Sequence, residues 1–230
     1  MSLELTTSSK IANYLLQIKA IKLETEKPFQ WSSGIYSPIY CDNRIVLSFP
    51  KIRKLVCDCF VEIIKEKYND TELVAGVATG GIGMGMLIAE KLDLPFVYVR
   101  PQAKKHGRKN QIEGLIKKNI KAIVIEDLIS TGKSSLNAVD ALKKEKVNVI
   151  GLISLFSYEL EDAKKNISKS GLNYCSLSNF SDLIKIALST NYIDTKQKEE
   201  IFKWRLNPQK WREANSVSYT HLRAHETLPY

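Results

Sequence analysis

The residues best suited to chemistry lie in one short string, IVIEDLISTGKSS, at residues 123–135. It begins as an apolar run typical of a buried strand, continues with two adjacent acids, and ends in a Ser/Thr/Gly turn before a helical pattern. Such a turn presents free backbone N–H groups and hydroxyls, which are the donors that hold a phosphate monoester. We predict a phosphate site made by Ser130, Thr131, Gly132, Lys133 and Ser134.

Two carboxylates precede this turn. Glu126 and Asp127 stand at the predicted end of the strand, where they can accept hydrogen bonds from two vicinal hydroxyls. A ligand that has both a phosphate and a neighbouring diol is a ribose 5-phosphate, so we predict that the site binds this group. We assign the intervening Leu128 and Ile129 to the same binding loop.

The string has two other interpretations. A nucleoside triphosphate loop requires a glycine at the position of Asp127. An ordinary strand-to-helix turn with a capping serine would leave Glu126 and Asp127 as solvated acids. Both account for less of the string than a ribose phosphate site does.

Two further loops follow predicted strands. Gly80 and Gly81 allow the backbone to approach a charged group such as pyrophosphate, although a helix packed tightly on a sheet would also need them. The loop at residues 100–114 is strongly basic, which is typical of a solvated surface or a nucleic-acid patch. It lacks the interleaved aromatics expected of the latter. Its basic residues are Arg100, Lys104, Lys105, His106, Arg108 and Lys109.

Two acids followed by a Thr-Gly turn resemble the signature of phosphoribosyltransferases that use phosphoribosyl pyrophosphate (PRPP). The basic loop resembles the Arg...Lys-x-His-Gly pattern of orotate phosphoribosyltransferases in particular. The segment FQWSSGIYSPIYCDNR at residues 29–44 resembles their orotate-side motif. The likeness extends over residues 5–212 and implies a type I phosphoribosyltransferase fold. It also implies a pentosyl transfer from PRPP to orotate, giving orotidine 5′-monophosphate in UMP biosynthesis.

The resemblance also implies residue roles. Lys104, His106 and Asp127 are the expected catalytic residues, and Arg100, Lys104 and His106 join residues 126–134 in binding PRPP. Cations in that loop would stabilise charge on the departing pyrophosphate. The hydroxyl of Ser130 and backbone groups around Ser33 and Gly34 are the expected orotate contacts.

The cofactor and partner that the resemblance implies are Mg²⁺ and a second copy of the chain. Mg²⁺ keeps several waters when it binds, so we expect the donor and water to hold it rather than protein ligands. The expected homodimer brings the basic loop to the neighbouring site. The chain departs from the common family pattern at Ser32, Pro101 and Ser157, where many relatives carry Lys, Lys and Arg.

Two alternative functions are open. A purine or uracil phosphoribosyltransferase would share the donor site, but the segment at residues 29–44 favours orotate. A non-catalytic regulator would bind nucleic acid through its basic surface, yet the sequence contains no helix-turn-helix or concentrated basic face.

The elements that must position these residues alternate between strand and helix after residue 50. We predict a parallel, doubly wound α/β sheet flanked by helices, with a small antiparallel N-terminal hood at about residues 1–47 and a core at about residues 50–190. The first helix is expected behind a cap at Ser8 or Ser9. Loops at the carboxyl ends of parallel strands meet in one cleft. The expected strands span residues 73–78, 95–100, 121–126 and 147–156.

The length and composition predict one globular domain with a small appendage, and the resemblance implies that residues 1–213 form a single phosphoribosyltransferase domain. The 230 residues are 44% hydrophobic and carry a net charge of +9, which favours an anionic partner. Four cysteines without metal-site spacing, and no signal or membrane-spanning stretch, predict a cytoplasmic protein that binds no membrane. Residues 214–230 follow no helical or strand period and resemble translated adapter sequence, so we expect a non-native tail.

Overall fold

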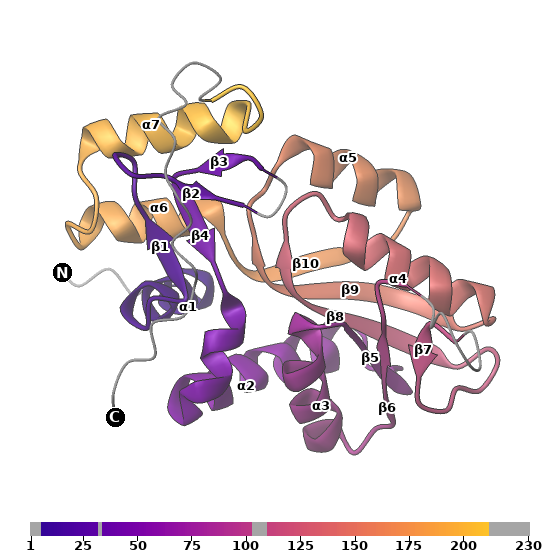
Figure 1. The fold of residues 1–230 in the computed structure, drawn as a ribbon. Helices are drawn as coiled ribbons and strands as arrows, with labels where there is room; N and C mark the ends of the chain where they lie inside the picture. The colour runs from indigo at the N-terminus through magenta and orange to yellow at the C-terminus, as the bar shows by residue number, and fades with distance from the viewer. Residues whose placement is uncertain (1–5, 32–33, 103–109, 212–230) are drawn as a thin grey trace.

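A computed structural model describes residues 6–31, 34–102 and 110–211 (Figure 1). Its centre is a sheet of six strands in the order β10-β9-β8-β5-β6-β7, and neighbouring strands are parallel except for the antiparallel pair β6–β7. This confirms the predicted parallel α/β sheet. The strands are β5 Leu73–Val77, β6 Phe96–Val99, β7 Ile112–Glu113, β8 Lys121–Ile129, β9 Asn148–Ser157 and β10 Tyr174–Asn179.

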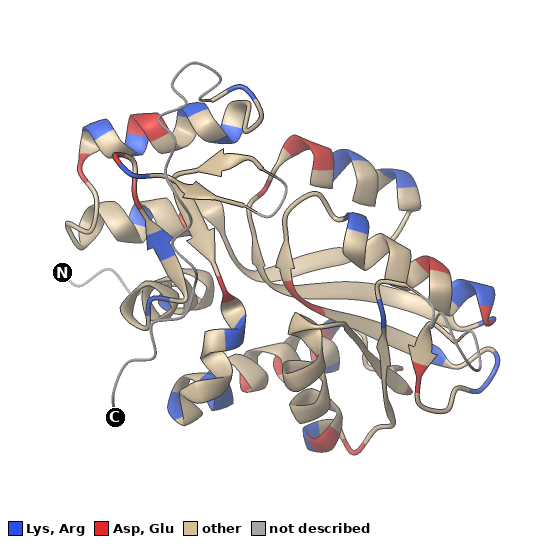
Figure 2. Cartoon of the chain, viewed as in Figure 1, with Lys and Arg blue, Asp and Glu red and all other residues tan. Residues whose placement is uncertain are grey.

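Helices cover both faces of the sheet, with α4 and α5 on one side and α2 and α3 on the other (Figure 1). Lys and Arg are spread over helices on both sides rather than gathered on one (Figure 2). Among the described residues, no helix is both long and apolar enough to cross a membrane. The helices are α1 Thr7–Gln17, α2 Pro50–Lys67, α3 Gly80–Leu92, α4 Lys133–Lys144, α5 Glu161–Ser170, α6 Phe180–Ser189 and α7 Thr195–Leu206.

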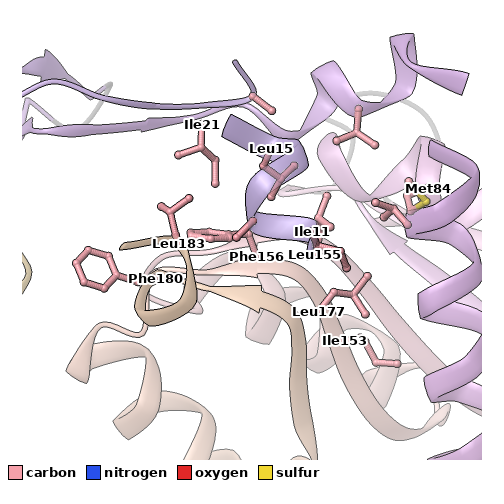
Figure 3. Packing of buried hydrophobic residues seen from close by; sticks show 14 of the residues in the cluster. Ile11, Leu15, Ile21, Met84, Ile153, Leu155, Phe156, Leu177, Phe180 and Leu183 are labelled. Atoms are coloured by element: carbon pink, nitrogen blue, oxygen red, sulfur yellow. The ribbon is translucent and has the colours of Figure 1, made fainter. Parts of the chain in front are cut away.

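Alternation along the strands creates two hydrophobic cores. In β5, Leu73, Ala75 and Val77 face the core under α4 and α5, whereas Val74 faces the larger core under α1, α2, α3 and α6. Figure 3 shows part of the larger core, where side chains of α1, α6 and the hood meet those of β9 and β10. The sheet is therefore buried on both faces, and this packing holds the ends of its strands in place.

The hood contains two small antiparallel pairs, as predicted. β1 (Ile21–Leu23) pairs with β4 (Ile39–Cys41), and β2 (Phe29–Gln30) pairs with β3 (Tyr36–Ser37). A 3₁₀ helix, η1 (Asn43–Ser48), then leads to α2. An aromatic cluster joins the hood to the end of the chain. Trp31 lies 5.6 Å from Trp204 of α7 and 5.3 Å from Tyr158, between ring centroids.

The predicted boundaries were wrong at two informative places. α1 is capped by Thr6, whose side chain accepts from the Ser9 N–H at 3.2 Å, while Ser8 donates to Asp182 at 2.6 Å instead. β8 continues beyond Glu126 to Ile129, because Leu128 and Ile129 still pair with β9. Both errors arise from partners that are distant in sequence.

Candidate active site

The candidate site lies at the carboxyl ends of β5 and β8. The chain leaves β5 towards β6 on one side and later returns to build β8, β9 and β10 on the other, so these two strands flank the topological switch point. A cavity of about 300 Å³ opens there between the loop after β5 and the end of β8. Its lining residues are Ala78, Thr79, Gly80, Glu126, Asp127, Leu128, Ser130, Thr131, Gly132, Ser134 and Ser135.

Glu126 forms the inner wall of this cavity and is 5% exposed. Its carboxylate accepts from the Ser135 hydroxyl at 2.7 Å and from the Asp127 backbone N–H at 3.1 Å. Burial, followed by the neighbouring charge of Asp127, raises the pKa of Glu126 well above its ordinary value. The side chain is thus held by α4 and by its own strand.

Asp127 presents the more accessible carboxylate. A Cβ atom added at Gly80 would overlap that carboxylate, so the first turn of α3 and the end of β8 are in direct contact. The backbone carbonyl of Asp127 accepts from the Asn43 side-chain amide at 2.6 Å. The two acids therefore differ, since Glu126 is enclosed while Asp127 stands at the cavity wall between α3 and η1.

The turn at residues 130–134 ends in a helix start suited to an anion. Gly132 precedes α4 with a φ of +77°, a left-handed conformation that favours glycine, and it has no side chain to occupy the first N–H groups of the helix. The carbonyl of Thr131 accepts from the Asn166 amide of α5 at 3.0 Å. Free N–H groups, nearby hydroxyls and the positive end of the helix dipole together can bind a phosphate.

A second cavity of about 250 Å³ lies next to the first, and both are lined by Ala78 and Ser134. Arg100 and Lys133 line this second cavity, and Arg100 also pairs with Glu113 at 3.4 Å. Arg100 and Lys133, two of the predicted PRPP contacts, therefore line only this second cavity, together with residues at the end of β6 and in α4.

Most of the other predicted residues fall on the first cavity, but not all. Ile129 is 1% exposed and packs in the core under α4, while its carbonyl accepts from the Tyr158 N–H at 3.0 Å. Gly34 lies in the hood turn with a φ of +85°, and its N–H donates to the Trp31 carbonyl at 2.8 Å. Ser33, Lys104 and His106 lie outside the described residues.

Sequence reasoning missed four polar residues at this site. Thr79 and Ser135 line the cavity, and they lie at the start of α3 and in the first turn of α4, beside residues whose composition already indicated a site. Asn43 and Asn166 donate to backbone carbonyls near the end of β8 and in the turn after it, and both come from elements distant in sequence, so no local pattern could have revealed them. Within the described residues, no group of three or more His, Cys, Asp or Glu could hold a metal ion.

The environment of Glu126 gives a testable pH dependence. Because its pKa is higher in the folded than in the unfolded chain, its stability contribution is greatest below the ordinary Glu pKa and declines as the pH rises through the folded-state value. Glu126→Gln preserves both contacts, since the amide can accept from Asp127 N–H and donate to Ser135. We expect the melting temperature of the variant minus that of the wild type to increase between pH 5 and pH 8. A constant difference in thermal melts would contradict this.

The contact between Gly80 and Asp127 gives a second prediction. Gly80→Ala forces the carboxylate away, and overpacking of this kind costs about 1–3 kcal/mol. We expect the displaced carboxylate to reduce activity, measured as kcat/KM, on the order of tenfold to a hundredfold, because small misplacements of a group in a site have effects of this size. Gly83→Ala is the matched control in the same helix, because its Cβ meets the end of the flexible Leu47 side chain. Equal losses in both variants would contradict the prediction.

The comparisons with known proteins agree with this geometry. Residues 44–182 match the family model described as the phosphoribosyl transferase domain. The chain is 47% identical over 209 residues to the orotate phosphoribosyltransferase of Streptococcus thermophilus, covering 91% of this chain and all of the relative. It is 45% identical to that of Listeria monocytogenes over 90% of this chain and 99% of the relative.

A solved structure supports the same assignment at the level of fold. The orotate phosphoribosyltransferase from Aeropyrum pernix superimposes with a TM-score of 0.69 at 26% identity, over 80% of this chain and 99% of that one. The cavity therefore occupies the switch point of a fold shared with these enzymes. The chain belongs to the phosphoribosyltransferase family and, within it, to the orotate phosphoribosyltransferases.

Proposed function

We propose that this protein transfers the phosphoribosyl group of PRPP to N1 of orotate, releasing pyrophosphate and giving orotidine 5′-monophosphate. The observation that carries the proposal is the cavity at the switch point, where two carboxylates stand beside a phosphate-binding turn. This combination matches the vicinal hydroxyls and the 5′-phosphate of one ribose. The family membership supplies the acceptor, orotate.

The proposed reaction forms a bond between N1 of orotate and C1 of the ribose and breaks the bond from C1 to pyrophosphate, and the departing pyrophosphate takes up the proton that N1 loses. Positive charge develops on the ribose and negative charge on the leaving group. In this proposal Asp127 accepts hydrogen bonds from the ribose hydroxyls, and the turn from Ser130 to Ser134 fixes the 5′-phosphate. Arg100, Lys104 and His106 are the proposed cations for pyrophosphate, and Ser130 with the hood turn at Ser33 and Gly34 is the proposed orotate contact.

Mg²⁺ fits this proposal as an ion that arrives with the substrate. The oxygen donors in the cavity suit a hard cation, but both oxygens of Glu126 already accept protein hydrogen bonds. When bound, Mg²⁺ would neutralise charge on the pyrophosphate. In this arrangement its available ligands are the Asp127 carboxylate and oxygen atoms of PRPP.

We also infer a homodimer that works in the cytoplasm. The family pattern supports the dimer, because the basic loop of one copy is expected to reach the site of the other. A reducing compartment is supported by the free cysteines, which are Cys41, Cys57, Cys59 and Cys175. Sedimentation of the purified protein at the concentration used for assays would test the dimer, and a monomer with full activity would contradict it.

The direct test of the proposed function is an assay with Mg²⁺, PRPP and orotate that follows the loss of orotate absorbance. Uracil, hypoxanthine and adenine serve as acceptor controls. We expect turnover that depends on orotate. Turnover on another base would change the acceptor, and PRPP binding without turnover on any base would favour the regulator.

We propose that residues 1–213 form the whole catalytic domain and that residues 214–230 are dispensable. These last residues lie outside the described part of the chain. A chain ending at Glu213 is expected to keep kcat/KM and its melting temperature. A large loss of either value would show that the tail belongs to the domain.

A further inference from the structure

The hood and the donor site meet at one buried side chain, Asn43. It is 3% exposed and begins η1, with one residue between it and the end of β4. Its amide nitrogen donates to the carbonyl of Asp127, 84 residues away in the sequence, at 2.6 Å. This contact joins the hood to the carboxylate-bearing residue at the wall of the cavity.

The orientation of the Asn43 amide is fixed by its two partners. A carbonyl can only accept, so the nitrogen must face Asp127 and the oxygen must face the other way. There it accepts from the thiol of Cys41 at 3.3 Å. Burial, followed by the charges of Asp127 and Asp42, raises the pKa of the Cys41 thiol well above its ordinary value, so the thiol stays protonated as a donor at neutral pH.

The backbone of Asp127 is held on both sides by side chains. Its N–H donates to Glu126, and its carbonyl accepts from Asn43. On the register of β8 and β9, Glu126 and Leu128 pair with Ser154 and Phe156 on either side of it. With both peptide groups fixed, the direction of the Asp127 carboxylate depends on where Asn43 lies.

The position of Asn43 depends in turn on the hood turn. The Trp31 carbonyl accepts from the Gly34 N–H, and the Trp31 indole donates to the carbonyl of Ile39 at 3.1 Å. Ile39 begins β4, which leads through Cys41 to Asn43. The turn proposed to meet orotate and the residue proposed to meet ribose are thus joined by three hydrogen bonds and the short stretch of chain from Ile39 to Asn43.

Resting on the proposed function, we infer that Asn43 is a positioning residue that couples acceptor binding in the hood to the placement of Asp127 at the donor site. Asn43 itself lies outside the lining of the cavity. Its effect on the reaction is exerted through Asp127. Filling of one half of the site therefore changes the affinity of the other half, and the coupling is reciprocal.

The test measures orotate affinity by calorimetry with and without a saturating PRPP analogue whose ring oxygen is replaced by carbon, which binds without reacting. The ratio of the two affinities is the coupling. In the wild type we expect the analogue to tighten orotate binding, and in Asn43→Ala we expect the coupling to fall about tenfold, as for the loss of a buried hydrogen bond. The affinity of orotate alone should change less than the coupling does.

Asn148→Ala is the matched control, because Asn148 is exposed at the start of β9, at the opposite end of the sheet strands from the cavity. It should keep the wild-type coupling. If Asn43→Ala does not fold, Asn43→Ser replaces it, since serine keeps a polar group but is too short to reach the carbonyl. A melting curve of each variant verifies that it is folded.

The outcomes are distinct from those of the activity assay. Loss of coupling in a folded Asn43 variant supports the inference. Wild-type coupling in that variant, or no coupling in the wild type, overturns it even if orotate turnover is normal. Absence of orotate turnover in the wild type would instead overturn the proposed function.

Discussion

Asp127→Ala is expected to lower kcat/KM for PRPP and orotate about 10²–10³-fold, the range found when one preorganised electrostatic group is removed from a site. The substitution removes the carboxylate proposed to hold the ribose hydroxyls while positive charge develops on the ring. It also removes the charge that disfavours ionisation of buried Glu126. We therefore expect the melting temperature to stay level or rise while activity falls, which steady-state kinetics and thermal melts would measure together.

The control for this variant is Asp70→Asn. Asp70 is exposed and pairs with Lys121 at 2.7 Å near the start of β8, far along the strand from the cavity. Exposed pairs of this kind contribute about 0–1 kcal/mol, so activity should be unchanged. If Asp127→Ala kept most of its activity, Asp127 would not be a catalytic residue of the site. A parallel loss of stability and activity would indicate a structural role.

Lys104→Ala is expected to reduce kcat on the order of 10²-fold or more, with a smaller effect on the affinity for PRPP. Lys104 lies in the basic loop outside the described residues, so this prediction rests on the family pattern of the loop and on the chemistry of the leaving group. A cation that meets the pyrophosphate as it departs stabilises the transition state more than the bound substrate. Single-turnover and steady-state kinetics would separate the two effects.

Lys118→Ala is the control for charge alone. Lys118 is exposed in the turn before β8 and carries the same charge, but it does not line either cavity. Its loss should leave kcat unchanged. Full activity of Lys104→Ala would remove this residue from the proposed mechanism, and equal losses in both variants would point to a general effect of net charge.

The sequence predicted the four strands β5, β6, β8 and β9 because each is a mostly apolar run, which can be recognised from neighbouring residues alone. It did not predict β7, which has two residues, or β10, which contains Ser176 and Ser178. The carboxylates and the phosphate turn were also predictable, since they occupy one string. The cap of α1 was not, because Ser8 is recruited by Asp182, and neither was the true end of β8, which depends on β9. The role of Asn43 could not be predicted for the same reason, because it depends on a partner 84 residues away.

The aromatic cluster of Trp31, Tyr158 and Trp204 affects the order in which parts of the protein can fold during translation. The sheet strands around the cavity have all been synthesised once translation reaches Ser157. Trp204, which is fully buried against the hood, is translated later, close to the end of the described chain. A nascent chain can therefore assemble the proposed ribose phosphate site first. The hood, where orotate is proposed to bind, lacks its aromatic contact with Trp204 until translation of α7 is complete.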